Sequence, residues 1–294
     1  MPMPRPMPPP TPPSMPPPST PPSTPTPTPL PASWPAAPDV VPGTVVLVGG
    51  GPGDPGLITV RGLAAIRAAD VIVHDRLAPL ECLAQARPDA EIVPVGKEPR
   101  GHQTPQQRIN EILVDRALRG LAVVRFKGGD NFVFGRGSEE WQACAAAGVP
   151  VKVIPGVTSA VAVPALAGIP VTHRSLTQGC TIVSGHVPPG DPRSTIDWAS
   201  LATANTTLVI LMGVTYLADI AAALVAGGMP GDTPAVVIER GATPAQRMVH
   251  GNVTTLPGRA AQQRIRPPAI VVVGAVAGLE LDRPADRRDV DAEN

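Results

Sequence analysis

The sequence lacks the features that mark several large classes of protein. Its 24 basic and 24 acidic residues give a formal net charge of zero, whereas a protein that binds nucleic acid mainly through phosphate contacts is expected to be basic. No apolar run approaches the roughly 20 residues of a membrane span, and the N-terminus has no apolar h-region of a secretory signal. The three cysteines are widely separated, and the histidines lack metal-ligand spacing. We therefore expect a cytoplasmic protein without nucleic-acid, membrane or metal binding.

Proline is unevenly distributed. Nearly half of the 41 prolines fall within residues 1–42, a segment with only two charged side chains. Such a segment buries too little apolar surface to offset an ordering cost of roughly 1–2 kcal/mol per residue. We expect a disordered proline-rich tail over residues 1–42 and a charged disordered tail over residues 283–294. The remaining residues suffice for a core and two lobes.

Short runs rich in valine and isoleucine alternate with helix-length segments. Unalternating runs of this kind are typical of strands that are buried on both faces. The predicted strands are 44–48, 71–73, 121–126, 149–154, 181–183, 207–212, 235–238 and 269–273. The predicted helices are 57–69, 105–119, 138–147 and 215–227.

These patterns predict the start and end of one helix and the division of the chain. Thr104 and Gln107 fit a capping box at the start of the helix 105–119, and Gly120 fits its end. The alternation of strands and helices favours α/β sheets with ligands at the C-terminal ends of strands. A break near residues 155–160 predicts an N-terminal α/β lobe over 43–155 and a C-terminal α/β lobe over 156–282.

A glycine-rich loop follows the first predicted strand. Gly51, Gly53 and Gly56 match the dinucleotide fingerprint G-x-G-x-x-G, and Asp75 ends the next apolar run. However, Pro52 and Pro55 remove two backbone donors, and a pyrophosphate cradle works through such donors. A dinucleotide site and a tight turn without ligand both remain open at this point.

A second loop follows the predicted strand 121–126. Gly128 and Gly129 allow a ligand to approach the backbone closely, and Asp130 can accept hydrogen bonds from ribose hydroxyls or face a cation. A Gly-Gly-Asp sequence is also a common turn. Its combination with the proline-bearing first loop is more specific than either loop alone.

The sequence resembles the tetrapyrrole methylase family, and within it the uroporphyrinogen-III C-methyltransferases. The resemblance spans about residues 44–280. Its main motifs are VLVGGGPGDPGLITVRGL (46–63), VVRFKGGDNFVFGRGSEE (123–140), VIPGVTSA (153–160), GIPVTHR (168–174), TLVILMG (207–213), ERGATPAQR (239–247) and PAIVVVG (268–274). Asn131 departs from the family, which usually has proline there.

The resemblance implies a fold, a cofactor and a reaction. The fold is two α/β lobes with the active site in the cleft between them, usually in a homodimer, and it is not the Rossmann-like methyltransferase fold. The cofactor is S-adenosyl-L-methionine, which leaves as S-adenosyl-L-homocysteine. The reaction is C-methylation of uroporphyrinogen III at positions 2 and 7, which gives precorrin-2 via precorrin-1 for sirohaem or cobalamin biosynthesis.

The resemblance also assigns residues to the site. The cofactor-binding set that it implies is Pro52, Gly128, Gly129, Asp130, Val133, Thr158, Ser159, Met212 and Gly241. Thr158 and Ser159 also fit the cap of a following helix. For the substrate carboxylates, arginine is the suitable anchor because its fork binds them bidentately. Arg136 and Arg174 are the candidates, and Arg76 is a weaker one.

Two assignments of the proton transfer remain open. The family's suggested proton acceptor corresponds to Asp75 and its suggested donor to Lys97. Alternatively, Arg136 and Glu139, which are three residues apart, meet at the start of one helix and carry the proton step.

Two other functions also remain open. One is a methylase that acts on a later precorrin. The other, from a different class, is an NAD-dependent dehydrogenase or a non-catalytic binding module.

Overall fold

The computed structural model describes residues 40–96, 104–279 and 281. Both predicted tails, apart from residues 40–42, lie outside these residues. The described residues belong to one compact unit, and its strands form two five-stranded sheets. No helix in this described part of the chain is long and apolar enough to cross a bilayer.

The first sheet is entirely parallel. Its strands, in spatial order, are β3 (Glu91–Pro94), β2 (Val71–His74), β4 (Val123–Lys127), β1 (Val45–Gly49) and β5 (Val151–Ile154). The order β3-β2-β4-β1-β5 differs from the Rossmann order 3-2-1-4-5, in which β1 and β4 are exchanged. The dinucleotide interpretation of the first loop therefore lacks the sheet topology that it requires.

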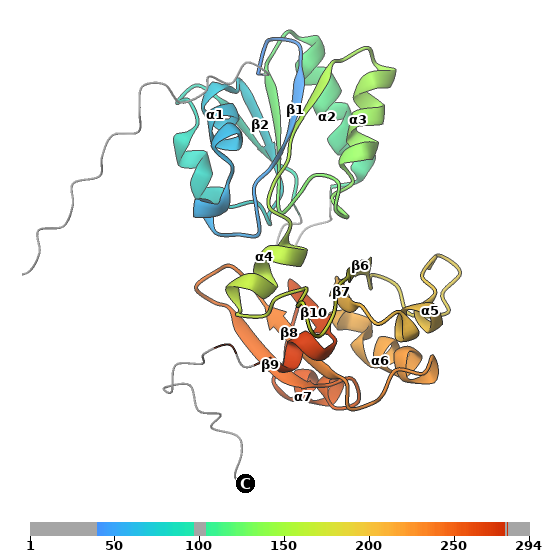
Figure 1. Cartoon of the computed structure of the whole chain (residues 1–294). Coiled ribbons are helices and arrows are strands. Elements are labelled where there is room, and N and C mark those ends of the chain that lie inside the picture. The colour runs from blue at the N-terminus through green and yellow to red at the C-terminus, as the bar shows by residue number, and fades with distance from the viewer. Residues whose placement is uncertain (1–39, 97–103, 280, 282–294) are drawn as a thin grey trace, which may run out of the picture. The chain divides into compact units, whose positions relative to one another are not determined.

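Both faces of the first sheet are covered by helices, as the unalternating runs predict (Figure 1). Val46 and Val48 pack on the side of α1 (Val60–Ala68), which contributes Ile66. Val45 and Leu47 pack on the opposite side, against residues of α2 (Gln106–Leu118) and α3 (Gly137–Ala146). The central strand β1 is therefore buried on both faces.

The second sheet is mixed. Its order is β6 (Cys180–Ser184), β7 (Thr207–Leu211), β10 (Ala269–Val273), β8 (Pro234–Glu239) and β9 (Arg247–Asn252). Only β6 and β7 pair in parallel; the other pairs are antiparallel. One face carries α5 (Trp198–Thr203), α6 (Leu217–Ala226) and α7 (Leu256–Gln262), and the other carries α4 (Ser159–Leu166).

Most predicted elements are present, with two kinds of difference. All eight predicted strands and four predicted helices overlap elements of the same type. The strands β3 and β9 and the helices α5 and α7 were not predicted, and of α4 only the start at Thr158 and Ser159 was. The predicted capping box at Thr104 and Gln107 is wrong, because Pro105 occupies the N-cap and no side chain caps the helix. The boundary at residue 155 stays a prediction, and β5 ends just before it.

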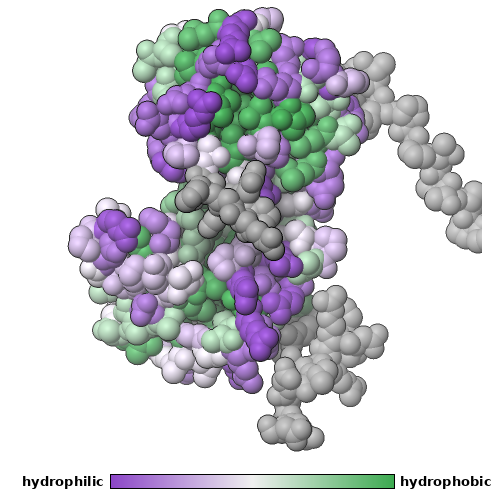
Figure 2. Space-filling view, turned by 180° about the vertical axis from the view of Figure 1, so that it is seen from behind, coloured by the Kyte–Doolittle hydropathy of each residue, from purple (hydrophilic) through white to green (hydrophobic). Residues whose placement is uncertain are grey.

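Several large apolar side chains remain exposed near the first sheet. Phe132 and Trp141, whose ring centroids are 6.4 Å apart, belong to this group together with Phe134. Figure 2 shows one face of the molecule, on which hydrophobic surface is exposed over the half that carries the first sheet.

Candidate functional site

A cavity of about 1150 Å³ lies where loops from both sheets meet. From the first sheet it is lined by residues that follow β1, β2 and β4, that is, by the C-terminal ends of parallel strands. From the second sheet it is lined by the end of β7, the end of β8 and the start of β10. Ligands of open α/β sheets bind at such strand ends.

Three glycines bring backbones into direct contact beside the cavity. A Cβ on Gly156 would lie 2.2 Å from the carbonyl oxygen of Gly129, and a Cβ on Gly49 would lie 2.4 Å from the backbone nitrogen of Gly156. Gly129 itself has a φ of 68°, a conformation that favours glycine. The loops that follow β1, β4 and β5 therefore have no room for side chains between them.

Asp130 shapes the loop that follows β4. Its Oδ1 accepts hydrogen bonds from the backbone N–H groups of Phe132 and Val133, at 2.8 and 3.3 Å. Its Oδ2 accepts one from the backbone N–H of Gly156, at 3.2 Å. The carboxylate thus ties two loops together while Asp130 also lines the cavity.

Asn131 fixes the same loop from beneath. It is fully buried, and its Nδ2 donates to the carbonyl oxygens of Ile154 at 2.9 Å and of Leu47 at 3.3 Å. The backbone carbonyl oxygen of Asn131 accepts from the backbone N–H of Gly137 at 3.0 Å. The residue that departs from the family pattern therefore joins the loop to β1 and β5.

The cofactor set implied by the resemblance lies around this one cavity. All nine residues line it: Pro52, Gly128, Gly129, Asp130, Val133, Thr158, Ser159, Met212 and Gly241. Thr158 is also the N-cap of α4, where its Oγ1 accepts from the backbone N–H of Ala160 at 3.3 Å. The capping interpretation of Thr158 is therefore confirmed. The ligand contacts of these residues stay a prediction.

Arg136 and Glu139 meet at the start of α3, as their spacing predicts. The Arg136 Nε lies 2.9 Å from Glu139 Oε1 and its Nη2 lies 2.6 Å from Glu139 Oε2, a bidentate pair. The hydrogen bond from Arg136 lowers the pKa of Glu139. Arg136 lines the cavity, whereas Glu139 does not. Arg136 also holds a φ of 59°, which is uncommon for a residue other than glycine.

Asp75 lines the cavity at the end of β2, with 31% of its side chain exposed. Its Oδ1 accepts from Arg125 Nη2 at 2.5 Å, and its Oδ2 lies 4.0 Å from Lys127 Nζ. Asp75 is therefore held by a buried guanidinium, a partner that the sequence analysis did not identify.

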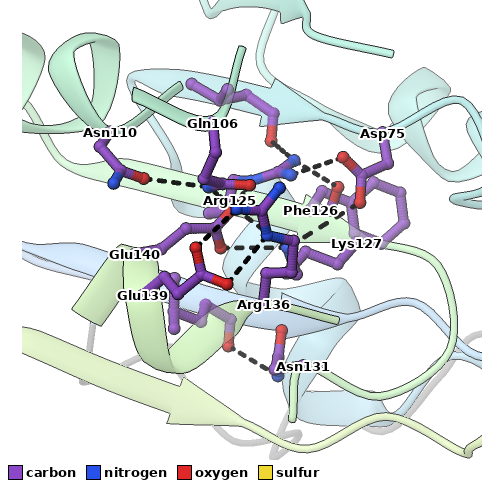
Figure 3. A network of polar contacts seen from close by, with 12 residues as sticks. Asp75, Gln106, Asn110, Arg125, Phe126, Lys127, Asn131, Arg136, Glu139 and Glu140 are labelled. Carbon is purple, nitrogen blue, oxygen red and sulfur yellow. Dashed lines mark hydrogen bonds and ion pairs between the residues drawn. The ribbon is translucent and has the colours of Figure 1, made fainter. Parts of the chain in front are cut away.

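Arg125 and Lys127 are the two cations beneath this edge of the sheet, and both are buried. They lie two residues apart on the same face of β4 and share one partner, Glu140 of α3, which is fully buried (Figure 3). Glu140 Oε1 lies 2.9 Å from Arg125 Nε, and both Glu140 oxygens lie 3.0 Å from Lys127 Nζ. Removing one partner of such a buried pair typically costs about 3–5 kcal/mol.

The pKa shifts in this cluster follow from its burial and its charges. Burial lowers the pKa of Lys127, and the neighbouring Arg125 lowers it further. Burial, together with the Glu140 carboxylate, raises the pKa of the Cys144 thiol to about 11. Cys144 therefore stays protonated at neutral pH and supplies no thiolate. The sequence signal for the cluster was the presence of two cations in an otherwise apolar buried strand.

Two predicted residues cannot be connected to the cavity. Lys97 lies outside the described residues, although Gly96 before it lines the cavity. Arg174 lies in an exposed turn and is not among the lining residues, so its proposed role gains no support from this geometry. Arg76, Arg240 and His186, by contrast, do line the cavity.

Comparisons with known proteins agree with this fold. The family model of tetrapyrrole (corrin/porphyrin) methylases matches residues 44–257. The siroheme synthase of Salmonella paratyphi B is 46% identical over 237 residues, which is 81% of this chain and 51% of that protein. The siroheme synthase of Methylobacillus flagellatus is 44% identical over 237 residues, 81% of this chain and 50% of that protein. The chain thus spans about half the length of these relatives.

Solved structures match over nearly their whole length. The uroporphyrin III C-methyl transferase of Thermus thermophilus is 39% identical with a TM-score of 0.66, covering 80% of this chain and 99% of that one. The same enzyme complexed with S-adenosyl homocysteine is 38% identical with a TM-score of 0.67, again covering 80% and 99%.

The two sheets and the cavity at their loops define an α/β protein of a two-lobed class distinct from the Rossmann arrangement. The chain belongs to the tetrapyrrole methylase family. The resemblance and the predicted fold class are therefore confirmed, and the dehydrogenase alternative loses its structural basis.

The close contact between the loops that follow β1, β4 and β5 predicts that an added methyl group at Gly156 destabilises the protein. We expect Gly156→Ala to lower the free energy of unfolding by about 1–3 kcal/mol, as overpacking typically does, because a Cβ there overlaps the Gly129 carbonyl. Chemical denaturation measures this value. Gly258→Ala is the control, since Gly258 lies in α7 and a Cβ there meets nothing within 4 Å. Equal stability of Gly156→Ala and the wild type would contradict the close packing.

Proposed function

We propose that this chain binds S-adenosyl-L-methionine and transfers methyl groups to carbons 2 and 7 of uroporphyrinogen III, giving precorrin-2 via precorrin-1. The observation that carries the proposal is the gathering of all nine family-implied cofactor residues around one cavity. The match to a uroporphyrin III C-methyl transferase over 99% of that enzyme's length supports it. The proposal concerns methyl transfer alone, because the chain spans only about half of its siroheme synthase relatives.

The cavity suits this cofactor chemically. S-adenosyl-L-methionine supplies a methyl group bound to a positively charged sulfur. The lining offers backbone groups at Gly128, Gly129 and Gly241 and the carboxylate of Asp130, all of which tolerate a cation nearby. A Cβ at Gly129 would meet nothing closer than 3.9 Å, so space is open beside that backbone. A solved relative holds the demethylated cofactor, S-adenosyl homocysteine.

The substrate side of the proposal rests on charge. Uroporphyrinogen III carries eight carboxylates, and four arginines line the cavity. Arg125 is buried and paired with Asp75 and Glu140, which leaves Arg76, Arg136 and Arg240 for the substrate. Arginine binds carboxylates bidentately, so these side chains are the proposed anchors. Alignment of donor and acceptor supplies most of the acceleration, because effective molarity contributes about 7–11 kcal/mol, whereas general-base catalysis contributes typically 10²–10⁴-fold.

A second candidate is methylation of a later precorrin. It is favoured by the cobalt precorrin-4 methyltransferase, which matches with a TM-score of 0.71, although its identity is 27%. Under anaerobic conditions, incubation with uroporphyrinogen III and a donor labelled in its methyl group distinguishes the two. Incorporation of two labelled methyl groups per macrocycle supports the proposal, and no incorporation with this substrate rejects it.

We also propose that the chain works in the cytoplasm as a homodimer, as its family suggests. The exposed aromatic side chains Phe132 and Trp141, whose ring centroids lie 6.4 Å apart, support an association surface, because large apolar side chains that remain exposed in a cluster often mark interfaces.

The bidentate contact of Arg136 with Glu139 predicts that a positive charge alone at this position does not support full activity. We expect Arg136→Lys to lower kcat/KM for uroporphyrinogen III by about tenfold or more, since lysine cannot reproduce the planar fork. Steady-state kinetics with labelled donor measures this. The control is Arg108→Lys, which alters a matching i,i+3 pair with Glu111 on α2, outside the cavity lining. Near wild-type turnover of Arg136→Lys would contradict the prediction.

Asp75 and the Arg136–Glu139 pair give different predictions for proton removal. If Asp75 accepts the ring proton, we expect Asp75→Asn to lower kcat by about 10²–10⁴-fold, the usual contribution of a general base. Binding of S-adenosyl homocysteine, measured by calorimetry, should be retained because Asn keeps the shape of the side chain. A normal kcat in Asp75→Asn would assign the proton step to Arg136 and Glu139.

A further inference from the structure

Glu140 is fully buried, and no part of the proposed mechanism so far uses it. It lies in the first turn of α3, where the helix dipole favours a carboxylate. Gln106 of α2 donates to its Oε1 at 3.3 Å, in addition to the contacts from Arg125 and Lys127. Four polar contacts from two other elements therefore converge on this one side chain.

The contacts of Arg125 continue from Glu140 to the edge of the cavity. On one side its Nε binds Glu140, and on the other its Nη2 binds Asp75 (Figure 3). Its Nη1 lies 3.3 Å from the Val73 carbonyl oxygen and 3.4 Å from that of Phe126. The guanidinium is thus held on all sides, and the only partially exposed member of this chain of contacts is Asp75.

Lys127 makes the second connection between the same two carboxylates. Its Nζ lies 3.0 Å from both oxygens of Glu140 and 4.0 Å from Asp75 Oδ2. Each oxygen of Asp75 therefore faces a buried cation, and both cations are held by Glu140. With both carboxylates ionised, two positive and two negative charges balance in the buried cluster.

We propose that Glu140 is a positioning residue: through Arg125 and Lys127 it sets the place and orientation of the Asp75 carboxylate at the cavity. This inference rests on the proposed function, since Asp75 matters there as a group facing the macrocycle. Glu140 also follows Glu139 directly in α3. One helical turn therefore contacts the cations that hold Asp75 and also pairs with Arg136, which lines the cavity. Glu140 is thereby connected to both groups considered for the proton step.

The direct test is Glu140→Gln, which keeps the size of the side chain and removes its charge. We expect kcat with uroporphyrinogen III to fall by about tenfold or more, because Arg125 and Lys127 lose their common partner and draw Asp75 inward. The KM for S-adenosyl-L-methionine and the Kd of S-adenosyl homocysteine should stay within about threefold, since the nine residues of the cofactor set are not altered. A kcat within twofold of the wild type would overturn the proposal, and so would a loss of cofactor binding equal to the loss of kcat.

A matched control separates positioning from loss of stability. Asp70 joins the opposite, N-terminal ends of the same strands β2 and β4: its Oδ2 accepts from the Ala122 backbone N–H at 2.8 Å, and its Oδ1 pairs with Arg87 at 2.9 Å. Asp70 does not line the cavity. We expect Asp70→Asn to lower the melting temperature while kcat stays within twofold of the wild type. An equal fall of kcat in Asp70→Asn would mean that Glu140 acts only through stability.

A double variant covers the case in which Glu140→Gln does not fold. Lys127→Met with Glu140→Gln removes one charge of each sign and leaves Arg125 paired with Asp75. We expect this variant to fold and to bind S-adenosyl homocysteine, with kcat still reduced by about tenfold or more because Asp75 lacks half of its support. Turnover within twofold of the wild type would overturn the proposal.

Failure of this inference is distinguishable from failure of the proposed function. A wild-type protein without methyl transfer to uroporphyrinogen III refutes the function, whatever the variants do. Crystal structures of the wild type and Glu140→Gln then still test the positioning. A shift of the Asp75 carboxylate toward Arg125 and Lys127 in the variant supports it, and an unchanged Asp75 overturns it.

Discussion

Two cations buried beneath the C-terminal edge of a parallel sheet have to be neutralised, and the first sheet is arranged around that constraint. Arg125 and Lys127 of β4 take their negative partners from the end of β2 and from the first turn of α3. A buried charge without a partner is among the most expensive features that a protein core can contain. The neutralised cluster therefore holds β2, β4 and α3 in one arrangement, and that arrangement brings Asp75 and Arg136 to the same cavity.

The loops that follow β1, β4 and β5 contribute mainly backbone groups to the site, not charged side chains. Gly49, Gly129 and Gly156 let three loops touch directly, and Asp130 and Asn131 tie these loops together through backbone hydrogen bonds. Peptide carbonyl groups and one carboxylate suit a ligand that carries a positive charge, because they offer partial and full negative charge. The proline-bearing first loop fits the same requirement, since Pro52 and Pro55 reduce the number of donors that an anion would need.

The sequence predicted those parts of the fold and site that depend on local pattern. Unalternating apolar runs such as 44–48 identified strands buried on both faces, and the i,i+3 spacing of Arg136 and Glu139 predicted a pair that the structure contains. What the sequence could not predict depends on contacts between distant segments. The apolar run of the exposed edge strand β3 is only Ile92 and Val93 before Pro94. The antiparallel pairing of β8 with β10 leaves no local signal, and the joining of Arg125 to Glu140 and Asp75 requires the sheet order.

The same network bears on the question of which group removes the proton. In the sequence, Asp75 and the Arg136–Glu139 pair are independent candidates for the proton step. In the structure they are connected, because Glu139 and Glu140 are neighbours on one helical turn and pair with Arg136 and with Arg125, respectively. A change at either pair therefore reaches the other through α3. Large losses of turnover at both sites would not by themselves identify two proton-transfer groups. Retained cofactor binding shows only that the site is intact, and the place of the Asp75 carboxylate in each variant separates chemistry from support.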